Sequence, residues 1–493
     1  MRPNLGGILV LFVPWLLSSL LSFSPSASWW VAWLGSWFIL LWGWSGGAGG
    51  IDTSVPWRLR LLHPIYLVQG IFAGYGFLTS IFYWFDISGI DLWGSGAAIS
   101  GSMEFAAKAQ RYYVLAHGSL AAGLLLGNNS RPGVSWQWAI GRSTAFLLLA
   151  VAALSALAAL VAGFVPGLGQ FDELFTHLAL VSSVMSLGPC LARSGRSLLP
   201  LSLLAIALLL AFALASGWKE EVLVITILLA LGTFPFFPKA TVVLGSTAFL
   251  TSLVVLPVIS NVVRQEAWRS GRDRWEALDT AWMQFNSLTG GEIAEINREF
   301  QVGRLSEIGM FTKYIESVET GTPSEGLIIA KQSLLAPIPR ILWKGKPNME
   351  NLVMQRAYAH GVISEHSNVS AKPHPMVDAY LLGGAVGICL SFIGIGLIAA
   401  RAYVFCKVHF GGYFLGGVFF NGLFSVLWRG NCFEFMFSTL FWGMLLAYGL
   451  AWVTRKTGWV KPMPLRLKGT QRPDLRSPIT AKWKRHNPYY NRG

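Results

Sequence analysis

The sequence has few charged residues for its length. Only 13% of its 493 residues are Asp, Glu, Lys or Arg, whereas 53% are hydrophobic, and the mean hydropathy is +0.51. A soluble domain usually has about 25% charged residues. The low charge content therefore excludes an ordinary soluble protein and predicts a membrane protein.

Motifs for metals, thiols and nucleotides are also missing. The four cysteines lie in or beside apolar runs without the paired spacing of a disulfide framework or a thiolate metal site. We find no Asp-x-Asp in the first short outer loop, no Gly-rich phosphate loop followed by Lys and Ser/Thr, and no His-Glu-x-x-His. These absences argue against a metal-dependent membrane glycosyltransferase of the oligosaccharyltransferase type, a nucleotide-driven pump and a zinc protease. We therefore expect neither a metal nor another cofactor.

Long apolar runs dominate what is present. A helix needs about 20 apolar residues to cross a hydrocarbon core of about 30 Å. Twelve segments are candidates: 5–23, 28–46, 62–85, 112–127, 142–164, 172–190, 198–215, 221–237, 240–260, 376–400, 411–428 and 433–453. The pattern predicts an all-α polytopic membrane protein with about twelve transmembrane helices, nine within residues 1–260 and three within 376–453.

The distribution of positive charge predicts the orientation. With the N-terminus in the cytoplasm, the inner connections and the tail hold 21 Lys and Arg residues, and the short outer connections hold four. The positive-inside rule then places both termini in the cytoplasm. The net charge of +14 is concentrated in the tail, residues 454–493, which we expect to be disordered and close to anionic lipid. The net charge therefore indicates the orientation of the chain in the membrane, and we expect no nucleic-acid partner.

One long polar segment, residues 261–375, interrupts the spans. It has 13 basic and 13 acidic residues, and the topology places it outside as a large, mainly helical loop. Trp268, Trp275 and Trp282 recur every seven residues, which indicates an amphipathic helix. That helix either packs on its neighbours or lies in the outer interface with its Trp face in lipid. A second apolar pattern, from Ile293 to Val318, predicts another helix.

Several cations in outer segments could contact a phosphate. Residues 337–347 place Arg340, Lys344 and Lys346 among prolines that stiffen the backbone, so this stretch could clamp a phosphate or diphosphate. It could equally be a charged interfacial loop anchored by Trp343. Lys219, in the connection between the seventh and eighth spans, could contact a ligand or pair with the two glutamates that follow it.

His374 stands where the tenth span begins. A histidine there could act as a general base on a sugar hydroxyl, or it could be an interfacial hydrogen-bonding residue. Its spacing from His360 and His366 does not suit a zinc site. Asp378, one turn further on, should face a cavity or a partner cation, because a lipid-facing carboxylate would be costly. Arg356 is a further candidate contact for substrate in the long loop.

Two stretches carry a resemblance to a known family. They are Pro339-Arg340-Ile341-Leu342-Trp343-Lys344-Gly345-Lys346-Pro347, and His374 followed by the glycines at 384 and 387. With one long loop between the ninth and tenth spans, the chain resembles the Wzy-type O-antigen/exopolysaccharide polymerases and the related O-antigen ligases. The resemblance implies a GT-C-like helical fold in the bacterial inner membrane. It also implies a metal-independent glycosyltransferase that joins oligosaccharide repeat units carried on undecaprenyl diphosphate.

The resemblance also implies roles for individual residues. His374 would be the catalytic histidine, and Arg340, supported by Lys346, the basic residue of the long loop. Lys219 would meet the lipid diphosphate, although Lys lacks the bidentate fork of the Arg found in the family. A flippase and a chain-length regulator would be partners. Transfer of a finished glycan to another acceptor, as in the ligases, and a flippase for lipid-linked oligosaccharide remain alternatives.

Overall fold

The structure is a computed structural model in which almost all elements are helices. It describes residues 4–49, 55–90, 92, 101–128, 134–138, 141–191, 195–305, 307–366 and 372–464. Of the residues that the structure describes, 79% are helical, in agreement with the all-α class that the sequence predicts. The described residues also form one two-stranded antiparallel sheet, in which β1 (Val134–Trp138) pairs with β2 (Val460–Pro464).

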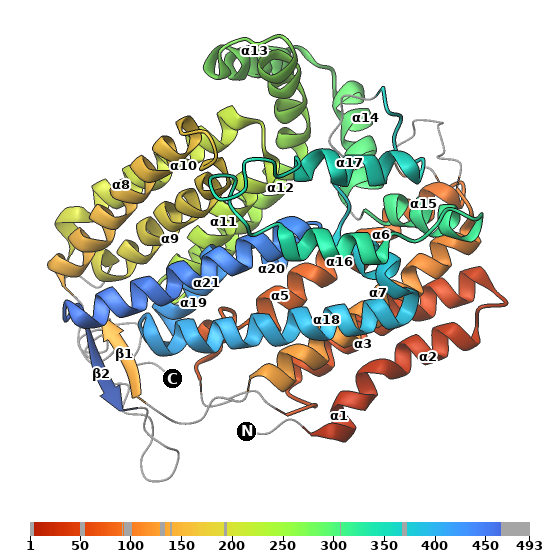
Figure 1. Cartoon of the computed structure of the whole chain (residues 1–493), viewed down its shortest axis with the longest axis horizontal. Helices are drawn as coiled ribbons and strands as arrows, with labels where there is room; N and C mark the ends of the chain where they lie inside the picture. The colour runs from red at the N-terminus through yellow and green to blue at the C-terminus, as the bar shows by residue number, and fades with distance from the viewer. Residues whose placement is uncertain are drawn as a thin grey trace.

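The helices follow the predicted order of spans and loop (Figure 1). Those before the long loop are α1 (Leu5–Leu9), α2 (Val13–Leu20), α3 (Pro25–Ser45), α4 (Trp57–Arg60), α5 (Pro64–Ala73), α6 (Ser80–Ile87), α7 (Met103–Gly127), α8 (Arg142–Phe164), α9 (Asp172–Leu191), α10 (Leu199–Ser216), α11 (Lys219–Thr233) and α12 (Pro238–Val263). The loop contains α13 (Arg274–Ser287), α14 (Gly290–Phe300), α15 (Ile308–Glu319), α16 (Gly326–Leu335) and α17 (Met349–Ala359). The chain then continues with α18 (Pro375–His409), α19 (Gly412–Leu423), α20 (Val426–Arg429) and α21 (Phe433–Lys456).

Seven helical segments in the described residues are long and apolar enough to cross a membrane. They are Pro64–Ile87, Arg142–Phe164, Gly169–Leu191, Arg196–Ser216, Pro238–Trp268, Pro375–His409 and Phe433–Lys456. The prediction of twelve spans is therefore not confirmed, although each of the other predicted segments is at least partly helical. Two of these, α11 with 15 residues and α19 with 12, are short for a span. The 21-residue α3 is long enough but rich in tryptophan, whose ring N–H makes it less apolar than an aliphatic residue.

The helices α7 and α18 pack side by side (Figure 1). Glycines let their backbones approach closely. A Cβ on Gly123 of α7 would lie only 2.2 Å from the carbonyl oxygen of Ile393, and one on Gly396 of α18 would lie 2.4 Å from that of Leu120. Small residues at the contact are the usual basis of tight packing between membrane helices. This contact fixes α18, which carries the candidate histidine at its start.

The helix α18 is interrupted near its N-terminal end. Gly383 and Gly384 have non-helical backbone angles, and Gly384 has a positive φ of 56°. These residues belong to the glycine-rich stretch noted in the sequence, so its glycines accommodate a break in the helix. The break leaves Pro375–Leu382 as a short separate segment, and this segment carries Asp378.

The long loop is helical, but its boundaries differ from the prediction. The span α12 continues as a π-helical turn to Arg269, beyond the predicted end at residue 260. Asp273 then caps α13, because its side chain accepts hydrogen bonds from the N–H groups of Trp275 and Glu276. The predicted tryptophan helix is therefore split, because Trp268 belongs to the π-helical turn that continues α12 and not to α13.

The tryptophan face of this region is not buried. Trp268, Trp275 and Trp282 are 45%, 47% and 42% exposed. The ring of Trp275 lies 5.5 Å from that of Phe212, an exposed residue on the span α10. The three tryptophans are thus half-exposed, and Trp275 also packs on a neighbouring helix, so both alternatives stay predictions.

The end of the described chain is more ordered than predicted. We placed a disordered tail at residues 454–493, but α21 extends to Lys456 and β2 follows at Val460–Pro464. Backbone hydrogen bonds to β1 tie this strand to the membrane domain. The rest of the predicted tail, residues 465–493, lies outside the described residues.

Candidate functional site

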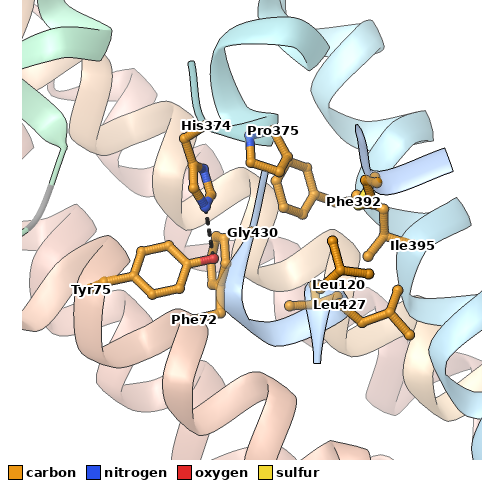
Figure 2. Close-up of a pocket in the computed structure, with 11 residues that line it drawn as sticks. Phe72, Tyr75, Leu120, His374, Pro375, Phe392, Ile395, Leu427 and Gly430 are labelled. Atoms are coloured by element: carbon orange, nitrogen blue, oxygen red, sulfur yellow. Dashed lines mark hydrogen bonds between the residues drawn. The ribbon is translucent and has the colours of Figure 1, made fainter. Parts of the chain in front are cut away.

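His374 lies at the start of α18 and faces Tyr75 (Figure 2). Its Nδ1 accepts a hydrogen bond from the N–H of Met376 at 3.3 Å, and its Nε2 lies 2.9 Å from the Tyr75 hydroxyl. Because Nδ1 is an acceptor, the proton of the neutral ring is on Nε2, which donates to the Tyr75 oxygen. Tyr75 belongs to the π-helical turn Gly74–Leu78, a conformation that is frequent at functional sites.

The two polar side chains border a small apolar cavity. Its walls include Phe72, Leu120 and Phe392, and Figure 2 shows these side chains around the His374–Tyr75 pair. The cavity volume is about 10 Å³, which is enough for about one water molecule. A sugar would therefore need the helices around His374 to separate before it could reach this cavity.

The environment of His374 keeps its ring neutral and oriented. Burial lowers the pKa of His374 to about 3, so the ring is uncharged near neutral pH. Gly430 packs directly against the ring, because a Cβ at this position would lie 2.3 Å from Nε2. Its φ of 75° and ψ of 150° are backbone angles that glycine adopts and other residues avoid.

Substitution of Gly430 by alanine should displace His374. The positive φ alone should cost about 1 to 3 kcal/mol, and the new Cβ would push the ring away from Tyr75. We expect a lower unfolding temperature in detergent together with loss of function. Gly271→Ala is the matched control, since Gly271 has a φ of 68° but no neighbouring atom within 4 Å of its Cβ position. Equal effects of the two substitutions would contradict a specific contact with His374.

A buried ionic cluster lies close to His374 along the chain. It consists of Arg356, Asp378 and Glu434, whose side chains are at most 1% exposed. The guanidinium of Arg356 donates to both carboxylates, and the N–H of Phe433 donates to Asp378 Oδ2 at 2.7 Å. The cluster therefore joins three elements, α17 of the loop, the short first segment of α18, and α21.

Arg356 is positively charged in this cluster. Burial alone would lower its pKa, but the carboxylates of Asp378 and Glu434 raise it above the ordinary value. The sequence predicts that Asp378 faces either a cavity or a partner cation. In the structure its partner is Arg356. Complete burial of Arg356 suits a residue that holds the site together better than one that binds substrate directly.

Cations and aromatic rings form a second polar region, which we call the cation–aromatic cluster. The guanidinium of Arg264 lies 4.9 Å from the ring centre of Trp218 and 5.0 Å from that of Trp268. The ammonium of Lys372 lies 5.9 Å from the ring centre of Trp218. Lys372 precedes His374 by two residues, so their Cα atoms are at most about 7 Å apart. Lys372 therefore places one cation of the cluster close to His374 along the chain.

Lys219 contributes to the same region. Its ammonium lies 4.2 Å from the ring centre of Phe300, and it follows Trp218 directly in the chain. The sequence left Lys219 either a ligand contact or an ion pair with the two glutamates after it, and both remain predictions. The carboxylates of these glutamates lie near Arg429. The distances from the Arg429 guanidinium are 3.9 Å to Glu220 and 3.1 Å to Glu221. Its contact with Phe300 and its place next to Trp218 in the chain put Lys219 beside the cation–aromatic cluster.

Arg429 is the centre of an ion-pair network beside this region. It pairs with Glu173 and Glu221, and the buried His177 lies 3.5 Å from Glu221. Glu173, His177 and Glu221 are close enough together to hold a metal ion. Because the guanidinium of Arg429 already compensates both carboxylates, we interpret the group as an ion-pair network.

The remaining sequence candidates lie in the turn after α16. Arg340 and Lys344 are exposed, and neither belongs to the described lining of the cavity beside His374. Lys346 donates to the carbonyl oxygens of Ala336 and Ile338 at 2.6 and 2.8 Å, which stabilises the turn. The three cations predicted to act together therefore have different environments.

Sequence reasoning missed several residues of the site. Tyr75 lies within an apolar run, where only its polar hydroxyl distinguishes it from its neighbours. Arg264 and Lys372 were counted only among the charges of the loop, and Glu434 was not among the candidate residues. The tryptophans at 218 and 268 were the available signal for Arg264, because aromatic rings frequently cover a guanidinium.

These features define a helical, membrane-embedded protein with a polar site where the loop meets the spans. The model of the family described as domain of unknown function DUF8712 matches residues 13–462. Since this match covers most of the chain, the protein belongs to that family. No curated protein and no solved structure matches the chain.

Proposed function

We propose that the protein is a membrane glycosyltransferase that polymerises oligosaccharide repeat units carried on undecaprenyl diphosphate. The site would face the outside of the bacterial inner membrane, with both termini in the cytoplasm. The observation that supports this proposal is the proximity of a neutral hydrogen-bonding pair, His374 and Tyr75, to the cation–aromatic cluster. A transferase of this kind needs to hold both a diphosphate anion and a sugar hydroxyl.

In this proposal the cation–aromatic cluster binds the diphosphate. Lys219, Arg264 and Lys372 would stabilise the negative charge that develops on the lipid diphosphate as the anomeric C–O bond breaks. Sugars commonly stack on aromatic rings, and Trp218 offers one beside these cations. We therefore locate diphosphate binding here, where the family resemblance placed it for Lys219, and give no part in it to Arg340 and Lys346, the basic residues of the long loop that the resemblance named.

His374 would orient the acceptor. A new bond forms between the anomeric carbon and the acceptor hydroxyl oxygen, and the hydroxyl proton leaves to the departing diphosphate or to water. In the tautomer inferred from the hydrogen bond at Nδ1, the Nε2–H of His374 is a donor, and burial makes the ring a weak base. A hydrogen bond that positions the acceptor suits this geometry better than proton abstraction.

Removal of single cations tests the diphosphate site. Lys372→Ala and Arg264→Ala should each reduce polymer formation from purified lipid-linked repeat units by about 10- to 100-fold, as expected for a lost hydrogen bond to a charged group. Lys313→Ala, an exposed lysine of α15, is the control. Gel analysis of glycan length measures the product. Undiminished long glycan in both cluster variants would refute this assignment.

A flippase is the second candidate, because the break in α18 and the buried charges of the ionic cluster also occur in transporters. A deletion strain separates the candidates. Single repeat units on the outer surface indicate a polymerase, whereas accumulation of repeat units on the inner leaflet indicates a flippase. Free polymer without its usual acceptor indicates a ligase. Interaction with a flippase and a chain-length regulator is part of the polymerase proposal.

A further inference from the structure

The helix α16 has an exposed apolar face although the sequence assigns it to an aqueous loop. Gly326, Ile329 and Ser333 are buried on one side of this helix. On the other side Leu327 is 90% exposed and Leu334 is 75% exposed. Large aliphatic side chains so exposed on neighbouring turns usually indicate contact with lipid or with another protein.

The position of α16 distinguishes it from a loop above the membrane. It packs on the spans α18 and α21, and Figure 1 shows it above α18. A Cβ on Gly326 would lie 2.8 Å from the carbonyl oxygen of Leu381 in α18. Just after α16, the carbonyl of Pro337 accepts a hydrogen bond from Trp442 at 2.8 Å. Trp442 is nine residues into α21, about 13 Å along that helix from Phe433. The helix α16 therefore lies beside the spans and not beyond their ends.

The turn that follows continues the same surface. Ile341 is 60% exposed and Leu342 is 78% exposed, between the exposed cations Arg340 and Lys344. This turn lies against Gly167, where a Cβ would be 3.4 Å from the backbone nitrogen of Ile341. Gly167 closely follows the span α8, which ends at Phe164, a residue 78% exposed. The apolar surface of the turn is thus continuous with the surface that a span presents to lipid.

We infer that α16 and the turn 336–347 are inserted into the bilayer interface and are covered by phospholipid. Acyl chains cover Leu327, Leu334 and Leu342, and anionic headgroups contact Lys331, Arg340 and Lys344. Lys331 lies on the exposed face of α16 between the two leucines, and its long aliphatic stem lets the ammonium reach the headgroups. Exposed apolar side chains interleaved with cations are typical of interfacial segments on anionic membranes.

This inference goes beyond the proposed function, because the ligand is bulk phospholipid and not the glycan donor. It also changes the predicted position of the long loop, because the middle of the loop returns to the membrane interface. The helices before and after α16 are thereby held at the membrane surface, and α17 carries Arg356 to the buried ionic cluster.

Spin labels on single cysteines test the insertion. The background is the full chain with Cys389→Ser, because Cys190, Cys406 and Cys432 are buried. Labels at Leu327→Cys and Leu334→Cys, in nanodiscs of phosphatidylglycerol, should be relaxed more strongly by oxygen than by a water-soluble nickel chelate. Thr320→Cys, an exposed polar position at the end of α15, should show the opposite preference. Preference for the nickel chelate at both leucine positions would overturn the insertion.

A second experiment tests the headgroup contacts. The purified protein should unfold at a higher temperature in phosphatidylglycerol nanodiscs than in phosphatidylcholine nanodiscs. The triple variant Lys331→Ala, Arg340→Ala, Lys344→Ala should lose most of this difference, and Lys313→Ala should keep it. If the triple variant keeps the full difference, the headgroup contacts are overturned. Because the preparation contains no lipid-linked glycan, neither result depends on the proposed enzyme activity.

Discussion

Replacement of Arg356 by methionine should destabilise the protein by about 3 to 5 kcal/mol, the usual cost of breaking a buried ion pair. Methionine keeps much of the side-chain volume but leaves Asp378 and Glu434 without their shared cation. Both carboxylates are almost fully buried, so water cannot compensate them. We expect a sharply lower yield of folded protein and a lower unfolding temperature in detergent.

Two further variants separate loss of charge pairing from loss of packing. Arg272 is exposed and pairs with Glu266 at 3.0 Å in the same loop, so Arg272→Met should cost at most about 1 kcal/mol. Combining Arg356→Met with Asp378→Asn and Glu434→Gln removes the uncompensated charges and should recover much of the stability. If Arg356→Met proved as stable as Arg272→Met, the cluster would not hold α17 to the membrane domain.

The helical membrane class could be predicted from composition because it depends on average hydropathy. Runs of apolar residues located the helices, since burial in lipid requires apolar side chains on every face. The number of spans was harder to predict. The same runs produce α11 and α19, which are short helices inside the membrane domain. They also produce α3, which is long enough to span but contains tryptophans that are partly polar. Length and composition of a run do not specify whether its helix crosses the bilayer.

The candidate site was only partly predictable for a different reason. His374 and Asp378 could be found because polar residues at the start of an apolar run are unusual. Their partners come from distant parts of the chain, Tyr75 from the π-helical turn between α5 and α6, and Glu434 from α21. Such contacts depend on the packing of α7 against α18 and on the break at Gly383, which local patterns do not specify.

Arg340 shows the limit of reasoning from a short motif. The prolines and cations of 337–347 indicate a stiff, positively charged turn, and the structure contains one. The direction in which that turn faces depends on α16, which packs beside the spans. The sequence of this motif resembles a phosphate clamp. In the folded protein, however, the motif is part of the surface that we assign to phospholipid.

Replacement of His374 by alanine should reduce polymer formation by about 100- to 1000-fold, as for loss of one preorganised hydrogen-bond donor. His374→Gln should retain activity within about tenfold of the native protein, because a glutamine amide can supply the donor that Nε2–H supplies. The measurement is the rate of glycan extension with purified lipid-linked repeat units. Equal losses in the alanine and glutamine variants would instead indicate that the imidazole acts as a base.

The pH dependence distinguishes the same two roles. Burial lowers the pKa of His374 to about 3 in the folded protein, below the value of about 6.5 expected when the chain is unfolded. Protonation therefore favours the unfolded state, so His374 should cost stability increasingly as the pH falls from about 6.5 toward 3, and nothing above 6.5. His374→Gln should unfold with a weaker pH dependence in that range. Its extension rate should follow the same profile as the native protein between pH 6 and 8, because a neutral donor does not titrate there; a native inflection near pH 6.5 that the glutamine variant lacks would contradict the positioning role.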